Sequence, residues 1–186
     1  MSEAEKRKSH DRILDAAADL LREKGIETTS VSEVMQAAGM THGGFYRHFP
    51  GKDDLVAAAF ERAVDKVVSE METAETDAEK QAARARYIDT YLSPRHVGDL
   101  RHGCPMAALG SELVRQDNGT AAQTAKAIDR VTALLQRDAA DDSADAQLAL
   151  LVGAVTLARL TRDEKRAAAI LRSARSALLD PPPPAT

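Results

Sequence analysis

Apolar residues recur along this chain at the three- and four-residue intervals of amphipathic helices. The first such stripe contains Ile13, Ala17 and Leu21 and predicts a helix over residues 9–24. Gly25 follows directly, and glycine readily adopts the backbone conformation that closes a helix. The opening of the chain is therefore predicted to be one amphipathic helix with a defined end.

Further stripes predict helices in the rest of the chain. One begins near Asp53 and continues towards Met71, and another ends near Tyr91, before a stretch at 93–99 whose composition is typical of a loop. Three more helices are expected in the last third, at residues 120–139, 143–161 and 163–179. Runs of Val, Ile and Thr typical of strands are scarce, so the pattern predicts an all-α fold.

The segment 29–49 has a different organisation, since it contains two short helices joined by a tight turn. Ser30 is suited to cap the first helix, and Gly39 supplies the backbone freedom for the turn. Thr41 is expected to cap the second helix. This is the layout of a DNA-reading helix-turn-helix, in which the early residues of the second helix reach the major groove.

Charge supports this interpretation locally rather than globally. The chain of 186 residues has a formal net charge of −4, which argues weakly against a nucleic-acid partner. From Val34 to Lys52, however, there is no Asp or Glu, and His42, Arg47 and His48 add to a locally positive surface. The alternative is a chance distribution in a short window.

Residues 25–55 carry a family pattern. Its matching positions are Gly25, Thr28, Thr29, Val31, Ala37, Ala38, Gly39, Gly43 or Gly44, Phe45, Tyr46, His48, Phe49, Lys52 and Leu55. In these residues the chain resembles the DNA-binding domain of the tetracycline-repressor (TetR) family of bacterial regulators. The resemblance implies an all-α homodimer that binds a palindromic operator and is released by a small-molecule inducer. It also implies a DNA-binding domain at 1–52, a ligand-binding and dimerisation domain at 53–180, and a Pro-rich tail at 181–186.

The resemblance further implies roles for single residues. Those expected at phosphates are Ser30, Ser32, Tyr46, His48 and Lys52. Those expected at bases and the adjacent backbone are Thr41, His42 and Gly43. Gly44 and Arg47 complete the expected DNA-binding surface, whereas Phe45 and Phe49 are expected to pack inward.

The helices predicted at 143–161 and 163–179 each carry an apolar stripe suited to a four-helix interface between two copies. The alternative is that both stripes fill the core of a single protomer. We favour a homodimer, because one helix-turn-helix reads only half of an operator.

Cys104 is the single cysteine, so the chain has no internal disulfide. Pro105 suits the first position of a helix, which leaves Cys104 at the cap, where the helix dipole would lower the pKa of its thiol. The sequence therefore offers a second hypothesis, a redox- or electrophile-sensing repressor that acts through Cys104. The alternative is a small buried residue at a helix start.

A pocket for an apolar or amphipathic molecule is expected in the C-terminal helices, with an uncharged inducer favoured. The expected lining residues are Met71, Tyr87, Tyr91, His102, Cys104, Met106 and Leu109.

His96, His102 and Cys104 also have a spacing that a metal-dependent enzyme could use. The sequence contains neither a glycine-rich phosphate loop nor a nucleophile elbow, so we expect no catalytic residue, no metal and no cofactor. A third reading is a helical dimer that binds protein and has lost DNA recognition.

The first eight residues are polar and lack the apolar core of a signal peptide, and the apolar run at 148–158 is too short to span a bilayer. A cytoplasmic location without membrane contact is expected. Residues 1–8 are expected to form a flexible arm whose basic residues 6–8 touch backbone phosphate or a minor groove, or else a solvated tail.

Overall fold

The computed structural model describes residues 2–116, 118–136 and 143–179, and throughout these residues the regular secondary structure is helical. The predicted all-α fold is confirmed. The elements are α1 (Glu3–Lys24), α2 (Val31–Ala37), the 3-10 helix η1 (His42–Arg47), α3 (Lys52–Glu72), α4 (Asp77–Tyr91), α5 (Pro94–Gly98), α6 (Pro105–Leu113), α7 (Asn118–Leu135), α8 (Ala144–Leu160) and α9 (Glu164–Leu179).

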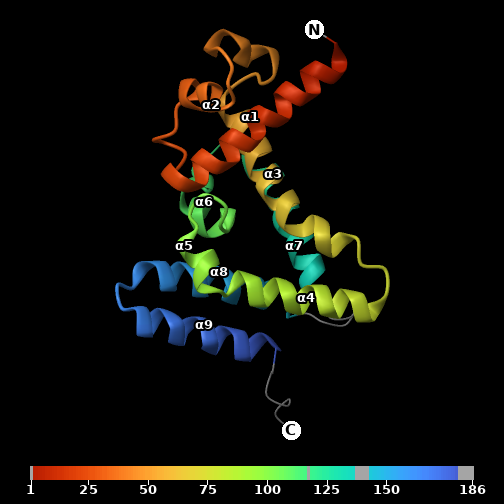
Figure 1. Cartoon of the computed structure of the whole chain (residues 1–186), viewed down its shortest axis with the longest axis vertical. Helices are drawn as coiled ribbons and strands as arrows, with labels where there is room; N and C mark the ends of the chain where they lie inside the picture. Colours follow the sequence, from red (N-terminus) through yellow and green to blue (C-terminus); the bar gives the residue numbers. More distant parts are fainter. Residues whose placement is uncertain (1, 117, 137–142, 180–186) are drawn as a thin grey trace.

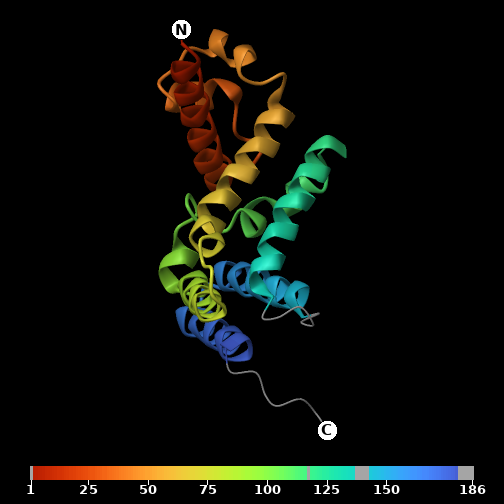
Figure 2. The same cartoon turned by 90° about the vertical axis from the view of Figure 1, so that its right-hand side faces the viewer.

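The molecule is elongated, with α1, α2 and η1 at one end and α4, α8 and α9 at the other (Figure 1). The long helix α3 runs between the two ends and packs on α1 and α7 (Figure 2). Its inward residues, among them Val56, Phe60 and Val64, are almost completely buried. The expected domain boundary at residues 52 and 53 falls in the first turn of α3.

The turn between α1 and α2 follows the sequence prediction closely. Gly25 ends α1 with a φ of 91°, in the left-handed region that favours glycine, and its N–H donates to the carbonyl of Leu21. Ser30 then caps α2 by accepting from the N–H of Glu33, and the Glu33 carboxylate accepts from the N–H of Ser30. This reciprocal capping box satisfies two donors that a helix start otherwise leaves free.

Gly39 makes the turn after α2 with a φ of 68°, as the sequence predicts. The element that follows is a 3-10 helix rather than an α-helix, and Thr41 stands at its start without a capping hydrogen bond from its side chain. The predicted cap at Thr41 is therefore wrong. Phe45 and Phe49 pack inward with ring centroids 5.8 Å apart and fix η1 against the core, as expected.

Two predicted irregular segments are helical. Residues 6–8 belong to α1, which begins at Glu3 because Ser2 and Glu5 form a capping box, so the flexible arm is wrong. The expected loop at 93–99 contains α5, since Ser93 caps a turn that Pro94 starts.

The last helices agree with the prediction to within a few residues, apart from the end of the helix expected at 120–139, where α7 ends at Leu135. Its expected last residues and the Pro-rich tail lie outside the described residues. Within the described part of the chain, no helix combines the length and hydropathy needed to cross a membrane.

Candidate functional site

The end of the molecule that carries α2 and η1 presents a polar surface built by residues 41–48, which we call the recognition segment. Thr41, His42, Gly43 and Arg47 are exposed, and Tyr46 is 72% exposed although it is a large aromatic side chain. Phe45 beneath it is buried and holds the Tyr46 ring edge-on, with the ring centroids 5.2 Å apart. Solvent-facing donors on a rigid base are what a phosphate- and base-contacting surface requires.

Three of the residues expected to contact DNA are less available for it, because two form hydrogen bonds within the protein and one is half-buried. The Ser30 hydroxyl bonds the Glu33 carboxylate, and Gly44 is half-buried beside Met35. The Lys52 ammonium donates to the carbonyl of Ile26 at 2.6 Å. Lys52 therefore holds the turn after α1, and only its remaining donors are available to a phosphate. Ser32 is exposed.

His48 is half-buried and belongs to a small ring cluster. The ring of His10 in α1 lies near those of His48 and Phe49, with centroid distances of 5.8 Å and 4.7 Å. Burial, together with the positive charges of His10, Lys6 and Arg47, holds the pKa of His48 below its usual value. A neutral His48 packs more readily than it binds phosphate. The positive charge of Lys6 acts on His48 from helix α1, and not from the flexible arm that the sequence predicted.

A carboxylate is also close to this surface, but it is compensated. Glu33 has a pKa lowered to about 2, because the N–H and hydroxyl of Ser30 and the Lys24 ammonium all stabilise its charged form. Lys24 lies 3.2 Å from the Glu33 carboxylate. The recognition segment itself contains no Asp or Glu, and the negative charge of Glu33 in the preceding helix is compensated by Lys24.

The turn after α1 is tied to the C-terminal helices by Glu112 of α6. Its Oε2 atom accepts from the N–H groups of Ile26 and Glu27 at 2.8 and 3.1 Å. The Lys52 ammonium binds the opposite side of the same peptide group, at the Ile26 carbonyl. No sequence motif signalled this contact, because its partners lie 86 positions apart.

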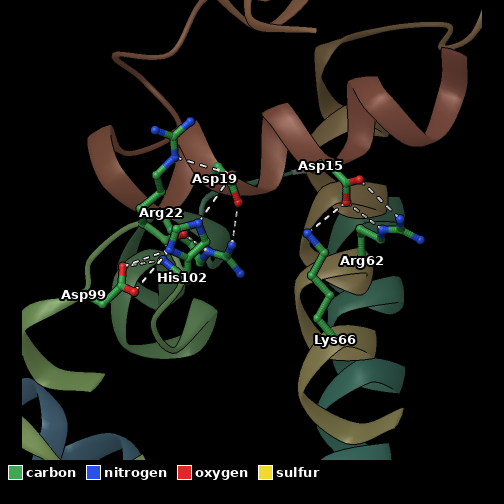
Figure 3. Close-up of polar contacts among 8 residues, drawn as sticks. Asp15, Asp19, Arg22, Arg62, Lys66, Asp99 and His102 are labelled. Atoms are coloured by element: carbon green, nitrogen blue, oxygen red, sulfur yellow. Dashed lines mark hydrogen bonds and ion pairs between the residues drawn. The ribbon is translucent and has the colours of Figure 1, made fainter. Parts of the chain in front are cut away.

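A second connection lies between α1 and the loop of residues 99–104, the 99–104 loop (Figure 3). The Arg22 guanidinium, which is 6% exposed, donates to the Arg101 carbonyl at 2.7 Å and pairs with Asp19 at 3.0 Å. The other Asp19 oxygen lies 3.4 Å from the Arg101 side chain and 3.7 Å from His102. One half-buried carboxylate therefore organises the contact between α1 and this loop.

The 99–104 loop is fixed on its other side by α8. Arg159 donates to the Val97 carbonyl just before the loop, at 3.1 Å. A Cβ atom at Gly103 would lie 2.4 Å from the Arg159 guanidinium and 2.4 Å from the Asp99 carbonyl oxygen. The close approach of loop and helix therefore requires glycine at this position.

The 99–104 loop also forms part of the wall of a cavity of about 320 Å³, at the lower end of the volumes typical of small-molecule sites. Six of the seven residues expected to bind a ligand line it, namely Met71, Tyr87, Tyr91, His102, Cys104 and Met106. Leu109 does not line this cavity and is buried in the core. The lining residues that the sequence did not indicate include His96, Lys66 and Arg86.

Cys104 caps α6 as expected, since its sulfur accepts from the N–H of Ala107 at 3.4 Å. The expected fall in pKa is wrong. Cys104 is 3% exposed, and burial raises the pKa of its thiol above the ordinary value despite nearby N–H groups and Arg159. Desolvation outweighs the helix dipole here, so the thiol stays protonated at neutral pH.

The described residues contain no group of three His, Cys, Asp or Glu side chains placed to hold a metal ion. His102 instead contacts Asp99 and Asp19. The side chains at His96, His102 and Cys104 therefore do not form the metal centre of the enzyme hypothesis.

Comparison with known proteins identifies the class of protein to which this chain belongs. Residues 13–59 match the family model described as bacterial regulatory proteins, tetR family. A transcriptional regulator of the helix-turn-helix type from Mycobacterium tuberculosis is 31% identical over 186 residues, covering 91% of this chain and 93% of the relative. The regulator AcrR of Shigella flexneri is 38% identical over 80 residues, covering 43% of this chain and 34% of its own.

The fold is shared with solved structures as well. A TetR-family transcriptional regulator from Agrobacterium tumefaciens superimposes with a TM-score of 0.70 at 22% identity, covering 91% of this chain and 97% of the other. Fold, recognition segment and relatives define a DNA-binding transcriptional regulator. The chain belongs to the TetR family.

The Asp19 contacts can be tested against a matched carboxylate on the same helix. Asp15 pairs with Arg62 and Lys66 of α3 at 3.0 and 2.9 Å, and is more exposed than Asp19 (Figure 3). We expect Asp19→Asn to lower the free energy of unfolding by roughly 1–3 kcal/mol, because it leaves the buried Arg22 with a weaker partner. Asp15→Asn is expected to cost less than about 1 kcal/mol.

Urea unfolding gives these free energies, and amide hydrogen exchange shows where they act. Exchange in residues 99–104 is expected to accelerate in Asp19→Asn and to stay unchanged in Asp15→Asn. Equal protection of this loop in both variants would contradict the assigned role of Asp19.

The burial of Cys104 predicts low thiol reactivity. At pH 7.5 we expect iodoacetamide to modify the native protein at least about tenfold more slowly than free cysteine, because little thiolate forms and access is blocked. Mass spectrometry follows the modification, and urea is expected to restore the rate. Rapid modification of the native protein, or peroxide-induced loss of DNA binding in wild type but not in Cys104→Ser, would revive the redox hypothesis.

Proposed function

We propose that this protein is a ligand-responsive repressor that binds a palindromic operator as a homodimer and releases it when a small molecule occupies the cavity. The observation that carries the proposal is the 99–104 loop. Its residues line the cavity, and the same loop is bonded to α1, on which the recognition segment is built. A change at the cavity thus has a short path to the DNA-binding end.

On DNA, the exposed side of η1 enters the major groove. Thr41 and His42, with the backbone at Gly43, face base edges, while Tyr46 and Arg47 face phosphates. Base contacts supply sequence preference, and phosphate contacts supply affinity that falls with salt. The exposure of these five residues supports the assignment.

The dimer forms through α8 and α9. After the exposed Asp145 in its first turn, the exposed positions of α8 are apolar, namely Ala146, Ala149, Leu150, Leu157 and Leu160. Leu157 and Leu160, which lie one turn apart on this helix, are 56% and 74% exposed. Neighbouring exposed leucines are typical of a surface that contacts another protein. Gly153 lies on this side with open space around it, so a second helix can approach closely.

Release follows from differential binding. A ligand shifts the equilibrium only if it binds one arrangement of the protein better than the other. Since the 99–104 loop is held by α1 on one side and by Arg159 of α8 on the other, a ligand that displaces it alters the position of α1 relative to the dimer helices. Two recognition segments so displaced no longer match successive major grooves.

The DNA-binding proposal predicts two different losses. His42→Ala is expected to reduce discrimination between operator variants by about 1–3 kcal/mol at one position, because it removes a base contact. Arg47→Ala is expected to weaken binding on all sequences and to lower the salt slope by about one. Lys80→Ala, an exposed cation of α4 at the other end of the molecule, is the matched control.

Fluorescence anisotropy with DNA from upstream of the gene and an unrelated duplex, titrated with salt, measures these changes. Weak and equal binding of the wild type to all duplexes tested, including operators found by selection from a random library, would refute the function. An equal loss on every sequence from His42→Ala and Arg47→Ala would refute the division of roles.

The dimer proposal predicts that charge on α8 dissociates the protein. Leu157→Glu combined with Leu160→Glu is expected to give monomers at micromolar concentration, because an interface cannot bury two unpaired carboxylates. Val114→Glu is the control, since Val114 is 82% exposed and lies beyond α6. Sedimentation velocity distinguishes the species, and a double variant that stays dimeric would place the interface elsewhere.

A further inference from the structure

The cavity has a mostly apolar wall that also carries a few polar and positively charged side chains. Most of its wall is apolar, from residues of α3, α4, α7 and α8 such as Val64, Ala83, Val131 and Leu148. Among the residues that the structure describes, neither Asp nor Glu lines it, whereas Lys66 and Arg86 do. The polar groups include the side chains of Tyr91, His96 and Cys104.

Two of these polar atoms are buried without a partner. The Tyr91 hydroxyl and the His96 Nε2 atom are inaccessible to solvent and have no hydrogen-bond partner among the described residues. Tyr91 is 3% exposed, and its ring stacks on that of His96 with centroids 4.6 Å apart. The neighbouring Cys104 thiol is at most a weak partner for the hydroxyl. A buried hydroxyl or imidazole without a partner is unfavourable, so the site favours a molecule that supplies one.

The charge state of this pair limits what that molecule can be. Burial, reinforced by Arg159, lowers the pKa of His96 to about 4, so its ring is neutral at pH 7. Burial raises the pKa of Tyr91, so its phenol keeps its proton. The pair therefore offers an O–H donor beside a neutral ring nitrogen. A ligand oxygen can accept from the Tyr91 hydroxyl, and a ligand hydroxyl or carbonyl can bond Nε2 of His96, depending on the tautomer of His96.

The surrounding charges exclude cations. Lys66 and Arg86 lie in the wall, and the positive charge of Arg159 acts on both polar groups, opposed at His96 by Asp99, which does not line the cavity. Lys66 is compensated by Asp15 at 2.9 Å, but the lining found in residues 2–116, 118–136 and 143–179 offers no carboxylate to an ammonium group. A bare cation in this cavity would lose its hydration without gaining a counter-charge.

We infer that the cavity binds an amphipathic molecule with an apolar body and an uncharged hydroxyl or carbonyl oxygen, which bonds Tyr91 and His96, and that it rejects positively charged ligands. The inference rests on the proposed function in that it names the chemical class of the inducer. The apolar wall receives the body of the ligand, and the two unpartnered polar groups orient it.

The test uses three probes with the same apolar body and different end groups: 1-octanol, octanoate and octylamine, which is protonated at pH 7. Each is titrated into the full-length protein without DNA, with isothermal calorimetry and thermal shift as readouts. We expect octanol to bind at least about tenfold more tightly than octylamine and more tightly than octanoate. Tighter binding of octylamine or octanoate than of octanol overturns the inference, as does the absence of octanol binding.

Two variants locate the oxygen. Tyr91→Phe keeps the ring and removes one hydrogen bond, and is expected to weaken octanol about threefold to tenfold. Met106→Leu, an apolar substitution in the same wall, is expected to change octanol and octylamine equally. Unchanged octanol affinity in a folded Tyr91→Phe variant overturns the assignment.

The outcomes for inducer class and for repression are separable, because the probes are measured without DNA. If octanol binds through Tyr91 but operator affinity is unaffected, the proposed release mechanism fails while the ligand chemistry stands. If the protein binds an operator and octanol is not bound, the ligand inference fails while DNA binding stands.

Discussion

The buried face of α3, which extends from Leu55 to Met71, is the constraint on which the arrangement depends. This helix begins directly after the recognition segment, packs on α1 in its first half through the Arg62–Asp15 pair, and forms part of the cavity wall with Val64 and Val67. Arg130 of α7 binds Asp65 and Glu72 along its second half. Because one rigid core element serves both ends, neither end can shift without repacking residues that are almost fully buried.

Polar contacts add direction to this rigid frame. The apolar core resists displacement in general, but Asp19 and Arg22 connect α1 specifically to the 99–104 loop, and Glu112 connects the turn after α1 to α6. Partly buried charged groups keep their stability only with their partners in place, which makes such contacts sensitive to small movements. The core therefore holds the two ends together, and the polar contacts add specific links between α1, the turn that follows it and the C-terminal helices.

Periodicity and local chemistry predicted what depends on neighbours in the sequence. The stripe of α1, the Ser30 cap, the glycine turns at Gly25 and Gly39, and the cap at Cys104 were all available from short windows. Contacts between distant parts of the chain could not be predicted in this way. Three features arise from residues far apart in the chain: the contact of Glu112, the hydrogen bond from Lys52 to the Ile26 carbonyl, and the desolvation of Cys104. Each alters the chemistry expected from the local sequence. The sequence also predicted an α-helix where η1 takes the 3-10 form, although it placed Phe45 and Phe49 correctly on the inward side.

The placement of the tyrosines gives the protein an optical property of its own. The chain has no tryptophan and three tyrosines, so its near-ultraviolet emission comes from tyrosine. Tyr46 stands exposed on the recognition segment, whereas Tyr87 and Tyr91 form part of the cavity wall, with ring centroids 5.5 Å apart. A soluble quencher such as iodide reaches Tyr46 far more easily than the buried Tyr91. Quenchable and protected emission therefore report on the two ends of the molecule separately, without any attached label.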